Sequence, residues 1–143
     1  MKQYELVSYI YDFISQLLDN KLIFEHVRKI ILFGSIVRGD YNKKSDIDIF
    51  IDITNITEKE KINLSIKKEI HKFETRAEKT WFLRSINLPF KLIVDNIENE
   101  KWKELREEIL NYGIIIYGKS EKTTNQLKHK ILINYELNRV SQK

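Results

Sequence analysis

The chain reads RKIILFGSIVRGDYNKKSDIDIFIDI from Arg28 to Ile53. Its first residues are a short run of large apolar side chains that ends at Phe33, which is typical of a buried strand. Gly34 and Ser35 follow at once. A glycine lets the backbone approach a ligand closely, and a turn there can present N–H groups and a hydroxyl to an anion such as phosphate. The pattern therefore predicts a strand that leads into an anion-binding turn.

A second strand is predicted ten residues after this glycine–serine pair, where isoleucine occupies every second position from Ile47 to Ile53. Side chains alternate between the two faces of a strand, so the isoleucines would share a buried face while Asp46 and Asp48 project from the other. The β-carbons of the two aspartates would then lie about 7 Å apart. Carboxylates this close repel each other without a cation, and their hard oxygens favour Mg²⁺ or Mn²⁺. The alternative interpretation is an ordinary strand with one wet, polar face.

The composition limits the class of protein. A chain of 143 residues with 42% hydrophobic residues is long enough for one compact domain with a core. The formal charge of +4 is compatible with a nucleotide or a nucleic acid, but acidic and basic residues are interspersed, so nucleic-acid binding is possible without being indicated. The absence of cysteine excludes disulfides and thiolate metal sites. No apolar stretch is long enough to cross a bilayer, so we expect a cytoplasmic protein without membrane association.

The remaining elements follow from helical periodicity, turn residues and short apolar runs. Their order predicts an α/β (α+β) fold in which helices pack on a small sheet. Residues 119–143 are predicted to add a weakly amphipathic C-terminal helix. Helices are expected at 2–19, 36–40, 57–78 and 98–112, and further strands at 90–95 and 114–117.

The arrangement of apolar strand, Gly34-Ser35, ten residues and Asp46-x-Asp48 resembles the signature of minimal nucleotidyltransferases of the DNA polymerase β superfamily. The resemblance covers a core of about residues 27–118 and implies a single nucleotidyltransferase domain over 1–143 with a small mixed sheet. It implies that Gly34 and Ser35 bind the phosphates of a nucleoside triphosphate and that Arg38 neutralises charge there. It also implies that Asp46 and Asp48 are catalytic and hold Mg²⁺ or Mn²⁺.

The same resemblance implies a third carboxylate on a neighbouring strand, and two registers are open. In the favoured register Asp95 is the third metal ligand and the presumed base, because the helix and strand that follow it come at the expected distance. In the other register Lys91 occupies the acidic position and the acid is missing. Asp52 is a weaker substitute, because it lies near the far end of its strand.

The implied activity is transfer of a nucleoside monophosphate, with AMP from ATP preferred, to a hydroxyl acceptor. The chain is most similar in length and motif to the antitoxin partners of HEPN ribonuclease toxins, which add AMP to a toxin tyrosine. A HEPN-type toxin, or a second copy in a homo-oligomer, is therefore the expected protein partner. The alternatives are a catalytically silent nucleotide- or partner-binding module of the same fold and a plain α/β interaction protein without a ligand.

Overall fold

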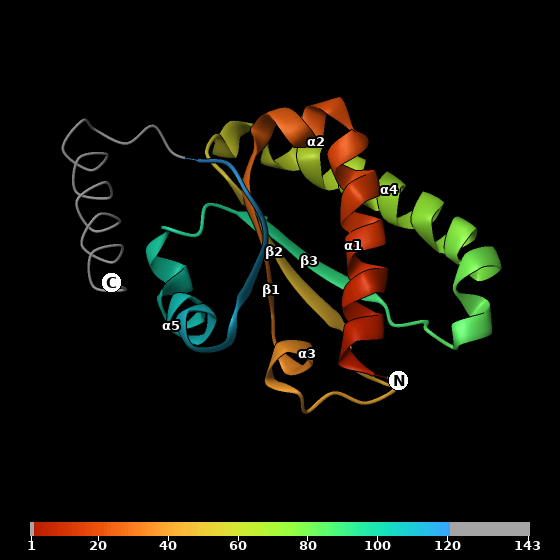
Figure 1. The fold of residues 1–143 in the computed structure, drawn as a ribbon. Helices are drawn as coiled ribbons and strands as arrows, with labels where there is room; N and C mark the ends of the chain where they lie inside the picture. The colour runs from red at the N-terminus through yellow and green to blue at the C-terminus, as the bar shows by residue number, and fades with distance from the viewer. Residues whose placement is uncertain (1, 121–143) are drawn as a thin grey trace, which may run out of the picture.

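The computed structural model describes residues 2–120, which Figure 1 shows as a sheet flanked by helices. The sheet has four strands in the order β3-β2-β1-β4. β1 is antiparallel to both β2 and β4, while β2 and β3 are parallel, so the sheet is mixed as predicted. The elements in chain order are α1 (Gln3–Asp19), α2 (Lys21–His26), β1 (Val27–Phe33), α3 (Ser35–Arg38), β2 (Ile47–Ile53), η1 (Ile56–Glu58), α4 (Lys59–Thr80), η2 (Phe82–Arg84), β3 (Phe90–Asp95), η3 (Glu100–Trp102), α5 (Lys103–Tyr112) and β4 (Ile114–Gly118).

One face of the sheet carries the main core, which packs against α1, α2 and α4 (Figure 1). The alternation predicted for β2 is confirmed, since its four isoleucines are all fully buried on this face. Aromatic rings from the helices and from β3 meet there, with the rings of Phe13 and Phe90 4.1 Å apart between centroids. Each fully buried side chain of this size contributes roughly 1.5–3 kcal/mol, so this face supplies much of the stability.

The opposite face carries a smaller cluster in which Phe50 packs against Ile31, Ile97 and the residues of η3 and α5. Phe50 meets the ring of Trp102 edge-on at 5.3 Å. Since side chains alternate along β2, Asp48 and Asp52 lie on this same face, one on each side of Phe50. β2 is therefore apolar on both faces at its centre, and its acidic side chains stand near its two ends.

The far end of β2 holds a buried cluster of charges. Asp52 is 0% exposed and Asp95 is 2% exposed, and the two are Cα partners in the β2–β3 pairing. Arg28 Nε donates to Asp52 Oδ2 at 2.7 Å, and the Ile97 N–H donates to Asp52 Oδ1 at 2.9 Å. Because buried charges cost free energy unless they are paired, these contacts are what allow Asp52 to lie inside the protein.

Asp95 is held in the same cluster by groups from two further elements. Trp102 Nε1 donates to its Oδ2 at 3.1 Å, the ammonium groups of Lys101 and Lys59 lie 3.0 and 3.6 Å from that oxygen, and the Asn96 N–H donates to Oδ1 at 2.8 Å. Burial alone would raise the pKa of Asp95, but these donors outweigh it and lower the pKa to about 2.

This depressed pKa predicts a loss of stability in acid. A carboxyl group that ionises more readily in the folded state stabilises the fold above its unfolded pKa, and the contribution disappears as the pH falls through the folded value. We expect the free energy of unfolding to drop by about 2 kcal/mol between roughly pH 4 and pH 2 on account of Asp95. Urea unfolding of wild type and Asp95→Asn across that window measures this drop. An equal dependence of the free energy of unfolding on pH in the two proteins would contradict the assignment to Asp95.

The helix expected from residue 57 begins as the 3₁₀ turn η1, and the cap of this turn is Asn55, whose Oδ1 accepts the Thr57 N–H at 3.1 Å. The predicted C-terminal helix lies outside the described residues. No helix within residues 2–120 is long and apolar enough to span a membrane.

Candidate functional site

The turn between β1 and α3 has a backbone conformation that only glycine adopts readily. Gly34 has φ +81° and ψ −156° and precedes the first residue of α3, Ser35. Gly39 ends the same short helix in the left-handed region with φ +86°. The first N–H groups of a helix have no intrahelical acceptor, so the N–H groups at this turn, with the Ser35 hydroxyl beside them, are available to an anion.

Gly34 also lies against the carboxylate of Asp48. Asp48 is the Cα partner of Phe33, the residue before the turn. A β-carbon added to Gly34 would stand 2.3 Å from Asp48 Oδ2, closer than real contacts allow. The glycine is therefore required twice, for its backbone conformation and for the space that the aspartate fills.

We predict that Gly34→Ala displaces Asp48 and weakens nucleotide binding. The unfavourable φ alone costs about 1–3 kcal/mol, and the new methyl group forces the carboxylate to move. Gly39→Ala is the matched control, since its φ is equally positive but nothing lies within 4 Å of the added β-carbon. Calorimetric titration with ATP and thermal melts should show both variants destabilised and only Gly34→Ala impaired in binding. Equal ATP affinities in the two variants would contradict the role of the Gly34–Asp48 contact.

The loop before β2 fixes the position of Asp46. The Asn42 N–H donates to Ser45 Oγ at 2.8 Å, and the Lys44 N–H donates to Asn42 Oδ1 at 2.7 Å. This tight, side-chain-bonded turn delivers the chain to Ile47, whose N–H donates to the Pro89 carbonyl of the neighbouring strand at 2.8 Å. Asp46 is thus exposed immediately before β2, beside Asp48.

Burial is the main cause that destabilises the ionised carboxylate of Asp48. Burial raises the pKa of Asp48 above its usual range, and the charges of Asp46 and Glu108 raise it further, while Lys91 and Arg38 act in the opposite direction. The carboxylate is therefore less stable here than in water. A bound cation would remove this cost.

Glu108, on α5, is a member of this site that sequence reasoning missed. Arg38 Nη1 donates to Glu108 Oε1 at 2.5 Å, and Arg38 Nε lies 3.4 Å from Asp40 Oδ2. The predicted phosphate-binding arginine is thus held beside the turn by an acid seventy residues away in sequence. No local motif surrounds Glu108, so only the packing of α5 on the sheet reveals it.

The structure does not bring Asp95 to the other two aspartates, so the favoured register was wrong. In the parallel pairing of β2 with β3, Asp48 is the partner of Lys91 and Asp52 is the partner of Asp95. Asp95 lies four residues farther along β3, about 13 Å away at 3.3 Å per residue. It is buried among Lys59, Lys101 and Trp102 at the other end, so it is neither a third metal ligand nor a base in this arrangement.

Asp46 and Asp48 nevertheless fit a divalent cation. Mg²⁺ is commonly held by one or two protein carboxylates and completed by substrate phosphates, and a carboxylate that burial destabilises, as at Asp48, fits such an ion. Within residues 2–120 no group of three or more histidine or acidic side chains is arranged to hold a metal. The site therefore offers two carboxylates and the anion-binding turn, and it relies on the nucleotide for further ligands.

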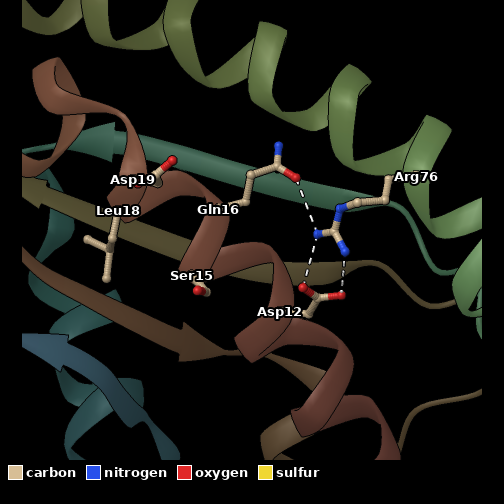
Figure 2. Close-up of a pocket in the computed structure, with 6 residues that line it drawn as sticks. All are labelled: Asp12, Ser15, Gln16, Leu18, Asp19 and Arg76. Atoms are coloured by element: carbon tan, nitrogen blue, oxygen red, sulfur yellow. Dashed lines mark hydrogen bonds and ion pairs between the residues drawn. The ribbon is translucent and has the colours of Figure 1, made fainter.

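A polar groove between α1 and α4 lies on the other face of the sheet and takes no part in this site. Figure 2 shows Arg76 donating to both carboxylate oxygens of Asp12 at 3.0 Å and to Gln16 Oε1 at 3.3 Å. Trp81 Nε1 also donates to Asp12, at 2.8 Å. These bonds pair the charges of Asp12 and Arg76 with each other, so they hold α4 against α1. Trp81 also packs against the main core.

A strand, a glycine turn at the start of a short helix and two aspartates at the start of the next strand are the arrangement expected of a nucleotidyltransferase site. The family model described as "Polymerase beta, Nucleotidyltransferase" matches residues 13–122. The chain belongs to this family, and it is a nucleotidyltransferase enzyme. The family generally uses divalent metals, in agreement with the paired aspartates.

Two relatives from Methanocaldococcus jannaschii, both named as candidate protein adenylyltransferases, support the same assignment. MJ0141 is 31% identical over 101 residues, which cover 66% of this chain and 94% of that protein. MJ0604 is 68% identical over 25 residues, which cover 18% of this chain and 25% of that protein. The similarity to MJ0141 therefore extends over nearly its whole length.

Solved structures resemble the chain more distantly. A candidate nucleotidyltransferase from Sulfolobus solfataricus has a TM-score of 0.49 and 16% identity, over 86% of this chain and 89% of that one. A toxin–antitoxin complex with AMP-PNP has a TM-score of 0.37 and 15% identity, over 99% of this chain and 93% of that one. Both TM-scores are below 0.5, so the family assignment rests on the sequence matches.

Proposed function

We propose that this enzyme transfers AMP from ATP to a hydroxyl group of a partner protein, with the help of Mg²⁺ or Mn²⁺. The observation that carries the proposal is the contact of Asp48 with Gly34, which places a paired carboxylate directly on an anion-binding turn. The name of MJ0141 as a candidate protein adenylyltransferase supports AMP as the group transferred and a protein as the acceptor.

In this mechanism the chain's own groups bind and orient the nucleotide. The N–H groups at the start of α3 and the Ser35 hydroxyl donate hydrogen bonds to the phosphate oxygens, and Arg38 exchanges part of its contact with Glu108 for phosphate. Asp46 and Asp48 would hold the cation, which when bound neutralises phosphate charge during displacement at the α-phosphorus. The acceptor oxygen forms a bond to that phosphorus, the bond to the bridging oxygen of pyrophosphate breaks, and the hydroxyl proton passes to solvent.

An exposed apolar surface beside the turn supports a protein acceptor. Its residues are Leu110 and Tyr112 at the end of α5 and Ile114 and Ile115 on the edge strand β4, where the two isoleucines project to opposite faces of the sheet, with Leu110 85% and Ile115 60% exposed. Ile114 pairs with Leu32, two residues before Gly34, so this surface adjoins the nucleotide turn. Clustered exposed apolar side chains often mark contacts with other proteins. The tyrosine of a HEPN-type toxin stays the predicted acceptor, and a second copy of the chain is the alternative partner.

The proposal is tested by titrating ATP into the purified protein with and without Mg²⁺, and then by supplying α-labelled ATP with a HEPN-type toxin. We expect ATP binding that requires the metal, label on a toxin tyrosine and release of pyrophosphate. Failure of wild type to bind ATP in the presence of Mg²⁺ would overturn the proposal.

The second candidate is a catalytically silent nucleotide-binding module. It is favoured by one observation, the place of Lys91 rather than an acid beside Asp48. It predicts metal-dependent ATP binding without release of pyrophosphate, whatever hydroxyl acceptor is supplied.

A further inference from the structure

Lys91 occupies a distinctive position on β3. It is the Cα partner of Asp48 across the parallel pair, and it lies on the same face of the sheet as Ile93, which packs in the α5 cluster. Its side chain is exposed, in contrast to the buried Asp95 on the same face of the strand. The lysine therefore stands beside the aspartate that contacts the nucleotide turn and is open to a ligand.

The charges around the site leave this lysine available to an anionic substrate. Lys91 is close enough to Asp48 for its charge to lower the pKa of that carboxyl group. The other cation of the site, Arg38, is already bound by Glu108 and Asp40. The lysines near Asp95 are likewise engaged, since Lys59 and Lys101 both contact its Oδ2. Of these cations within residues 2–120, Lys91 is the one beside the paired aspartates whose ammonium group makes no ion pair within 4 Å.

We propose that Lys91 is a substrate-binding residue that contacts the phosphate chain of the nucleotide and supplies a second positive charge beside the one that Asp46 and Asp48 hold. This inference rests on the proposed function. A lysine ammonium group is a compact charge that binds phosphate oxygens with up to three hydrogen bonds. Two-metal enzymes place two cations around the reacting phosphoryl group, and here a fixed side chain takes the place of one of those charges.

Removal of the Lys91 charge should change the affinities for ATP and for the metal ion in opposite directions. The Lys91 ammonium attracts phosphate but repels a metal ion held by its neighbour Asp48. Removing the charge should therefore weaken ATP binding and, in the absence of nucleotide, strengthen binding of the metal alone. A side chain that merely supports the fold would change both affinities in the same direction.

The test compares Lys91→Ala and Lys91→Arg with Lys67→Ala, which removes one exposed positive charge from α4 on the opposite face. ATP affinity is measured by calorimetry with Mg²⁺, and Mn²⁺ affinity without nucleotide by electron paramagnetic resonance. We expect Lys91→Ala to lose about 10-fold in ATP affinity, typical of a charge-assisted hydrogen bond, and to gain roughly 3-fold in Mn²⁺ affinity. Lys91→Arg should keep ATP affinity within about 3-fold, and Lys67→Ala should shift neither affinity by more than about 2-fold.

Two results would overturn the assignment of Lys91 while leaving the proposed function intact. The first is an ATP affinity of Lys91→Ala equal to that of the wild-type protein. The second is a loss of both ATP affinity and Mn²⁺ affinity in this variant, which would indicate a structural role. A wild-type protein without metal-dependent ATP binding would overturn the proposed function and the role of Lys91 together.

Discussion

The Asp48→Asn variant is expected to lose about 1000-fold in nucleotidyl transfer, the size of effect seen when a charged group acts on developing charge in a closed site. An amide cannot provide the negative charge that the paired carboxylates offer a cation. The fold should not suffer, because burial and the charges of Asp46 and Glu108 raise the pKa of Asp48, so that its ionised form costs the folded protein some stability. Pyrophosphate release and thermal melts measure the two effects.

The expected signature is therefore a loss of transfer with an unchanged or higher melting temperature. Asp46→Asn should lose transfer in the same way. Asp19→Asn, which removes an exposed carboxylate from α1, is the control for the change in net charge and should keep full activity. Transfer within about 10-fold of wild type in Asp48→Asn would refute the assignment of this residue as a metal ligand.

Asp52→Ala is expected to lower the free energy of unfolding by about 3–5 kcal/mol, the usual cost of removing one partner of a buried ion pair. Asp52 is fully buried, and its two oxygens accept hydrogen bonds from Arg28 and from the Ile97 N–H. The alanine would leave the arginine without its carboxylate and the buried N–H without its acceptor. Urea denaturation of the purified variant measures the loss.

The double variant Arg28→Met, Asp52→Leu separates the charge effect from simple loss of packing. Apolar side chains of similar volume often replace a buried ion pair at little cost, so much of the stability should return. If the double variant were as unstable as Asp52→Ala, the loss would come from packing or from the orphaned Ile97 N–H rather than from the arginine.

Local patterns were sufficient to predict the strands, since Gly34 marks the end of β1, period-two alternation marks β2 and the faces of its side chains, and a proline precedes β3. The same alternation could not choose between Lys91 and Asp95. The two are four residues apart and share a face, and only the pairing of β3 with β2 decides which of them meets Asp48. Pairing register between distant strands is set by the whole core, including the aromatic contacts of Phe90, and not by the strand's own sequence.

Local sequence patterns likewise predicted only part of the candidate site. Gly34, Ser35, Asp46 and Asp48 come from one continuous segment, so their association was readable from the sequence. Glu108 reaches Arg38 because α5 packs across the second face of the sheet, a contact that depends on the complete fold.

The acidic side chains at the two ends of β2 differ in how their negative charge is neutralised, and this difference affects how the enzyme can evolve. The charge of Asp52 is neutralised by Arg28 within the protein. The ionised carboxylate of Asp48 is destabilised by burial, and a cation bound from solution would stabilise it. Sites about 13 Å apart without shared contacts usually respond to substitution independently. Substitutions near Asp48 can therefore change the nucleotide or acceptor that the enzyme uses. The ion pair at Asp52 keeps its contribution to the stability of the fold, so such substitutions are better tolerated.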